Sequence, residues 1–64
     1  MFNAYKVKEE LKEQRYSQAQ LANFLGIAPS TLSDKLTGKS KFNADEAFRI
    51  AKFLNRDLEY FYNS

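Results

Sequence analysis

Only three residues, Gly26-Ile27-Ala28, separate two helix-length segments near the middle of the chain. The segment before them starts near Ser17 and stops at Gly26, where glycine can adopt the left-handed conformation that ends many helices. The segment after them begins at Pro29, whose missing N–H costs nothing in the first turn of a helix. Because an antiparallel pair would need a different turn geometry, two helices joined so tightly are expected to cross at a steep angle.

The rest of the chain also divides into short helical segments, since no stretch shows the sustained period-2 alternation of apolar residues typical of a strand. The spacing of apolar residues predicts helices over about residues 3–14, 17–26, 29–38, 43–54 and 57–62. The residues expected to cap four of their N-termini are Asn3, Ser17, Asn43 and Asp57. These segments predict an all-α fold, a compact five-helix domain that occupies residues 1–64 as a single unit.

The composition excludes several classes of function. The 64 residues include no cysteine and no histidine, so disulfides, thiolate metal sites, a cysteine nucleophile and a histidine general base are ruled out. The Asp and Asn ladder of a calcium loop is also missing. No segment approaches the roughly 18 apolar residues of a membrane span, and the N-terminus has no signal-peptide pattern. We therefore expect a cytoplasmic protein that uses no metal and no cofactor.

Small and apolar residues stand where the second and third predicted helices meet. Ala22 allows the helices to approach closely, Ile27 can fill the corner between them, and Leu32 points inward from the third helix. This is the sequence pattern of a helix-turn-helix, here over about residues 17–37.

The stretch SQAQLANFLGIAPSTLSDKLTGKSKFNADEAFRIAKFL resembles the helix-turn-helix domain of Cro and phage-repressor regulators, the XRE family, and the likeness extends over roughly residues 4–62. The positions that match the family pattern are Gln18, Leu21, Ala22, Leu25, Gly26, Ile27, Leu32, Leu36 and Gly38. One departure is Lys35, which occupies a place that is often apolar in the family, while Leu36 takes the core role beside it. The resemblance implies a dimer in a bacterial or phage-infected cell, with the third helix in the DNA major groove.

The third predicted helix carries short polar side chains opposite its buried leucines. At about 100° per residue, Leu32 and Leu36 define the core direction, and the remaining positions face away from it or lie on its flanks. Hydroxyls can donate to or accept from base edges, Asp34 can accept from cytosine, and small apolar groups at the helix start can touch a thymine methyl. The candidate base-reading residues are Ala28, Pro29, Ser30, Thr31, Ser33, Asp34 and Thr37.

Phosphate contacts are expected on both sides of this helix. The N-terminus of the second helix offers free N–H groups and a positive dipole end, which favour a phosphate. After the third helix comes the acid-free cationic run of the chain, which suits contacts to a DNA backbone. The candidate phosphate-contacting residues are Ser17, Gln18, Lys35, Lys39, Ser40 and Lys41.

The tripeptide Gly38-Lys39-Ser40 also ends the phosphate-binding loop of many nucleotide hydrolases. That loop needs a glycine five residues before Gly38, where this chain has Ser33, and it needs a strand in front of it. A helix is predicted there instead. We therefore expect no enzyme activity, and the phosphates bound by this segment should belong to DNA.

The expected function is a transcriptional regulator that binds double-stranded DNA, most simply a small dimeric repressor or a Cro-like switch protein on a palindromic operator. Tyr60 and Tyr62 exceed what a small core needs and are candidates for a weak homodimer contact. No membrane and no small-molecule ligand are expected as partners. The alternative is a helical protein-interaction module, such as an antitoxin or an anti-repressor, which the modest net charge of +2 slightly favours.

Overall fold

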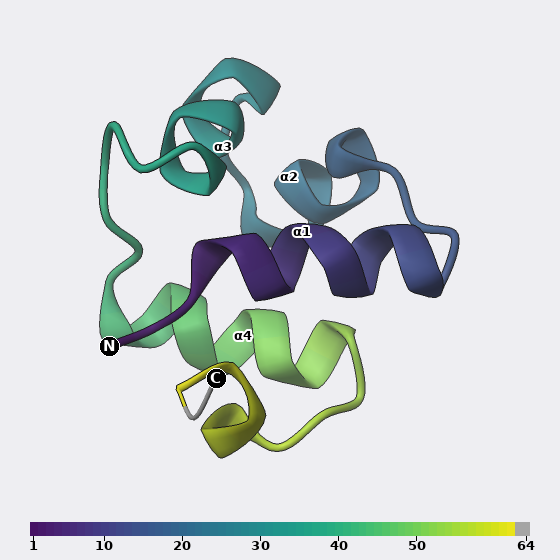
Figure 1. Cartoon of the computed structure of the whole chain (residues 1–64). Coiled ribbons are helices and arrows are strands. Elements are labelled where there is room, and N and C mark those ends of the chain that lie inside the picture. The colour runs from purple at the N-terminus through teal and green to yellow at the C-terminus, as the bar shows by residue number, and fades with distance from the viewer. Residues whose placement is uncertain (63–64) are drawn as a thin grey trace.

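The computed structural model describes residues 1–62, which fold entirely into helices and their connections (Figure 1). The helices are α1 (Ala4–Glu13), α2 (Gln18–Leu25), α3 (Pro29–Leu36) and α4 (Ala44–Phe53). The predicted all-α class is confirmed. The predicted count of five helices is wrong, because Leu58–Phe61 forms only a single 3-10 turn, η1. Asp57 precedes that turn without the predicted side-chain cap, as four residues are too few to build an α-helical ladder.

Side chains cap the N-termini of three helices, as predicted. The Asn3 carboxamide oxygen accepts from the Lys6 N–H at 3.1 Å at the start of α1. In α2, the Ser17 hydroxyl accepts from the Gln20 N–H, and the Gln20 side chain accepts from the Ser17 N–H in return. Asn43 forms the same reciprocal capping box at the start of α4. Local sequence therefore sets where these helices begin.

Each of the four α-helices is followed by a residue with positive φ. Gly26 and Gly38 take this conformation after α2 and α3, with φ of 73° and 91°, as their lack of a side chain allows. After α1 and α4 the same position is occupied by Arg15 and Asn55, with φ of 62° and 55°. Asparagine tolerates this region, whereas in arginine the Cβ comes too close to a backbone carbonyl oxygen, which is unfavourable. The chain thus turns sharply after every helix, and the turn after α1 is the strained one.

The core forms where the apolar faces of all the elements meet. α1 lies between α2 and α3 on one side and α4 with η1 on the other in the view of Figure 1. The Asn3 N–H donates to the Phe61 carbonyl oxygen at 2.8 Å, which holds the start of the chain against η1. No helix within residues 1–62 is long and apolar enough to span a membrane. The buried apolar residues are Val7, Leu11, Leu21, Ala22, Leu25, Leu32, Leu36, Ala47, Ile50, Ala51, Leu54 and Phe61.

Two carboxylates are buried, Glu10 and Glu46, and the first of them joins three elements. Glu10 of α1 is only 4% exposed, and it accepts hydrogen bonds from Gln14 at 2.6 Å, Arg56 at 2.9 Å and Tyr60 at 3.3 Å. Gln14 also donates to the Leu54 carbonyl oxygen at 2.8 Å. Burial alone would raise the pKa of the Glu10 carboxyl, but these hydrogen bonds and the Arg56 charge together hold it below its ordinary value. The cluster ties α1 to the end of α4 and to η1.

Candidate nucleic-acid interface

α3 buries one face and exposes the other. Leu32 is fully buried and Leu36 is 6% exposed, so the predicted core direction of this helix is confirmed. Four residues apart on a helix, the two leucines share one side, which leaves the opposite side to solvent. The exposed residues at and around α3 include every candidate for base reading: Ala28, Pro29, Ser30, Thr31, Ser33, Asp34 and Thr37.

The exposed face of α3 keeps most of its hydrogen-bonding capacity. The Thr37 hydroxyl donates to the Asp34 carbonyl oxygen at 3.3 Å and is thereby partly used. Within residues 1–62, no side-chain hydrogen bond or ion pair engages Ser30, Thr31, Ser33 or the Asp34 carboxylate. These side chains are short, so the edges of DNA bases in a major groove could come close to the helix.

The N-terminus of α2 has unused amides next to its cap. The first N–H groups of any helix lack partners within the helix. Ser17 and Gln20 satisfy two of them through their capping box, at 3.1 Å and 2.8 Å. The N–H groups of Gln18 and Ala19 remain for an external acceptor, and both residues are exposed. An anion would be favoured here by these amides and by the helix dipole.

The loop between α3 and α4 presents exposed cations. Lys39 and Lys41 are both exposed, with Ser40 between them. The start of the loop is held by the Lys39 and Ser40 N–H groups, which donate to the Asp34 carbonyl oxygen at 2.9 Å and 3.2 Å. This pattern after Gly38 is the usual way in which a left-handed residue ends a helix, so the two lysines leave α3 in a defined direction.

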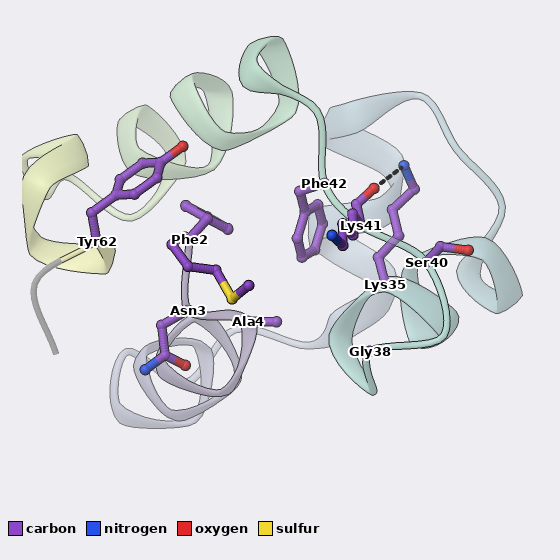
Figure 2. Close-up of a pocket in the computed structure, with 10 residues that line it drawn as sticks. Phe2, Asn3, Ala4, Lys35, Gly38, Ser40, Lys41, Phe42 and Tyr62 are labelled. Atoms are coloured by element: carbon purple, nitrogen blue, oxygen red, sulfur yellow. Dashed lines mark hydrogen bonds between the residues drawn. The ribbon is translucent and has the colours of Figure 1, made fainter.

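Lys35 behaves differently from the other predicted phosphate contacts. Its ammonium lies 2.7 Å from Glu46 of α4, and the two side chains are only 15% and 11% exposed. The same ammonium donates to the Lys41 carbonyl oxygen at 3.4 Å, as Figure 2 shows. Burial would raise the pKa of the Glu46 carboxyl, but hydrogen bonds from Lys35 and the Asn43 N–H and the charges of Lys35 and Arg49 hold it below its ordinary value. Lys35 is thus engaged within its own chain.

The two tyrosines predicted as dimer contacts have different surroundings. Tyr60 is half-buried, with its hydroxyl 3.3 Å from Glu10 and the Lys6 ammonium 4.2 Å from its ring centroid. Tyr62 is 40% exposed and packs its ring edge-on against Phe2, at 5.4 Å between centroids. Tyr60 therefore has partners inside the domain, whereas part of the Tyr62 ring remains accessible to another molecule.

A hollow lies between the start of the chain and the loop that carries the lysines. Its volume is about 720 Å³, and Phe2, Phe42 and Tyr62 line it together with Lys41 and Gly38 (Figure 2). Phe42 packs edge-on against Phe2, at 5.5 Å between ring centroids. This contact anchors the far end of the loop to the N-terminal segment.

An aromatic surface away from α3 was not found from the sequence. Tyr16, Phe53 and Phe24 form a row of tilted rings, with the Phe53 centroid 4.6 Å from Tyr16 and 4.9 Å from Phe24, and Tyr16 and Phe24 remain 38% and 41% exposed. Arg49 donates to the Phe24 carbonyl oxygen at 3.0 Å and covers part of that ring. Phe24 lies outside the buried stripe of α2, which consists of Leu21, Ala22 and Leu25, and an aromatic residue at such a position was the available signal.

Comparison with known proteins gives one result for this arrangement. The family model described as "Helix-turn-helix" matches residues 7–61, nearly the whole chain and all of α2 and α3. Searches of curated proteins and of solved structures gave no match.

Proposed function

Since the chain belongs to the helix-turn-helix family of Cro and phage-repressor type, which binds DNA, we propose that it is a sequence-specific transcriptional regulator acting as a small dimeric repressor. The observation that carries this proposal is the exposed polar face of α3. Along the chain, that face stands between the start of α2, with its unused amides, and the exposed Lys39 and Lys41. It has the form of a base-reading helix with backbone contacts on both sides.

In the proposed complex, α3 enters the major groove. Ser30, Thr31, Ser33, Asp34 and Thr37 face base edges, while Ala28 and Pro29 approach a thymine methyl. Asp34 accepts from a cytosine amino group and repels nearby phosphates, so it favours selectivity over affinity. Ser17 and Gln18 hold one phosphate at the start of α2, and Lys39, Ser40 and Lys41 hold the other strand's backbone.

The proposed operator is a palindrome read by two copies. A two-fold dimer places its reading helices on half-sites about one DNA turn apart. Tyr62, with its exposed ring edge, is the proposed contributor to the dimer contact. The contact is proposed to be weak and completed on DNA.

Selection of bound sites from random double-stranded DNA tests this function directly. We expect one recurring site with two inverted halves about one turn apart. Its affinity should fall with salt, because each lysine–phosphate contact adds about 0.9 to the slope of log K against log salt. Ser30→Ala should relax the base preference at one position of each half-site. Selection that enriches no sequence, together with no salt dependence, would refute the proposal.

A second candidate function is a protein-interaction module, and the exposed row of Tyr16, Phe24 and Phe53 favours it. Aromatic residues are enriched at protein interfaces. The discriminating variants are Ser30→Ala with Lys39→Ala on the α3 side, and Phe24→Ala on the aromatic side. If the wild-type protein selects no DNA and a bound protein is lost only with Phe24→Ala, the second function is the correct one.

A further inference from the structure

The geometry around Lys35 assigns this residue a role other than phosphate binding. We propose that Lys35 is a positioning residue that fixes the Lys39–Lys41 loop against α3 by bridging the Lys41 backbone to Glu46 of α4. The inference rests on the proposed function, because it concerns how the phosphate-binding lysines are aligned with the reading helix.

Lys35 joins three segments. It stands in the last turn of α3, pairs with Glu46 in the first turn of α4 at 2.7 Å, and donates to the Lys41 carbonyl oxygen at 3.4 Å. The loop between the two helices is therefore held from its middle. Phe42 adds a further contact, with its ring centroid 5.9 Å from the Lys35 ammonium.

Lys35 cannot bind a phosphate without releasing Glu46. At 15% exposure the lysine side chain lies mostly inside the domain, and the carboxylate that it neutralises is 11% exposed. Moving the ammonium out to DNA would leave that carboxylate with its charge poorly compensated, which is unfavourable in a site of low solvent access. Lys39 and Lys41 neutralise no carboxylate in this way, since no ion pair within the described part of the chain includes them.

Glu46 has a second task, which a glutamine can also perform. Its Oε1 atom also accepts from the Asn43 N–H at 3.0 Å, as part of the capping box of α4. A glutamine at this position can still accept that bond, because capping boxes use glutamate or glutamine. Glu46→Gln therefore removes the negative charge that faces Lys35 and keeps the cap and the side-chain volume. A hydrogen bond from Lys35 to a neutral oxygen then stands in place of the ion pair.

For Glu46→Gln, a purely electrostatic effect and a positioning role predict opposite changes in DNA affinity. Removing a negative charge near bound DNA should tighten binding if electrostatics alone acts. The positioning role predicts the opposite for Glu46→Gln, a loss of about tenfold in affinity for the selected site, which is within the range of coupling between contacting residues. Asp45→Asn is the matched control, because Asp45 immediately precedes Glu46, is 77% exposed in its side chain and pairs with Arg49 instead of Lys35. It should leave affinity unchanged or raise it slightly.

The double variant distinguishes positioning from direct contact. Lys35→Met should weaken binding at least as much as Glu46→Gln, and the two together should weaken it no more than Lys35→Met alone, because both act on the same link. Additive losses, or tighter binding by Glu46→Gln, would overturn the inference. Thermal unfolding of each variant verifies that it is folded at the assay temperature.

Amide hydrogen exchange supplies a readout that does not need DNA. The Ser40 N–H, bonded to Asp34, should exchange faster in Lys35→Met and Glu46→Gln and stay as in wild type in Asp45→Asn. Unchanged exchange in all three variants would contradict the positioning role. If the wild-type protein selects no DNA site, the proposed function fails, and the exchange measurement still decides whether Lys35 holds the loop.

Discussion

Replacing Glu10 with glutamine should destabilise the domain in a way that depends on pH. The carboxylate is 4% exposed and accepts from Gln14, Arg56 and Tyr60. Glutamine keeps the shape, and its oxygen can still accept from Gln14 and Arg56 if its NH₂ group turns toward the Tyr60 hydroxyl, which can accept in its place. The loss is then the difference between bonds to a charged acceptor and bonds to a neutral one.

That difference can be sized from the hydrogen bonds alone. Bonds to a charged group contribute about 1.5–3 kcal/mol, against about 0.5–1.5 kcal/mol for neutral pairs. We therefore expect Glu10→Gln to lower the free energy of unfolding by about 1–2 kcal/mol at pH 7, in line with one strong charge-assisted bond lost. For a domain of this size each kcal/mol shifts the melting temperature by about 4–8 °C.

The pH dependence follows from the direction of the pKa shift. The folded protein holds the pKa of Glu10 below its ordinary value, so its stabilising effect is fully present above about pH 4.3 and is lost as the pH falls through the folded pKa. The difference in stability between wild type and Glu10→Gln should therefore shrink between pH 5 and pH 3. Glu9→Gln, an exposed neighbour with the same charge change, should show little difference at either pH.

Urea unfolding followed by far-ultraviolet circular dichroism, at several pH values from 7 to 3, measures these differences. Equal stability of wild type and Glu10→Gln at pH 7 would refute the reasoning. So would a difference that persists unchanged at pH 3, because it would then arise from packing and not from the charge.

Three further predictions concern other parts of the molecule. Arg15→Gly should stabilise the domain by up to about 1 kcal/mol in urea unfolding, because it relieves a positive φ of 62° after α1; a loss of stability would show that the arginine is not strained. Leu32→Ala should cost about 2–5 kcal/mol, since the side chain is fully buried between α3 and the core, and a loss below 1 kcal/mol in the same assay would contradict that packing. Lys39→Met should reduce the salt slope of DNA binding by about 0.9 per bound protomer, while Lys52→Met on α4 should leave it unchanged; equal effects would argue against a phosphate contact at Lys39.

Helix positions were predictable because their signals are local. The capping boxes at Ser17 and Asn43 and the left-handed glycines after α2 and α3 act over a few residues, so the sequence alone indicates where the helices start and stop. The burial of Leu32 and Leu36 follows from helical periodicity, and it orients the exposed face of α3. The fifth segment was predicted less well, because four residues with apolar spacing do not reveal whether they form an α-helix or a 3-10 turn.

The partners of charged and aromatic side chains needed the tertiary structure. Lys35 and Glu46 are eleven residues apart, and Glu10 and Arg56 forty-six apart, so no local pattern pairs them. The sequence showed a lysine near the end of the third helix; only the tertiary structure showed that Glu46, in the first turn of α4, pairs with it. It also showed an excess of tyrosines, but packing beside Glu10 decided that Tyr60 belongs to the domain.

Sequence by itself determined the helices and the exposed polar face, because backbone capping and periodicity are local. The fold decided which charges are paired within the domain, because burial and pairing depend on segments that are distant along the chain.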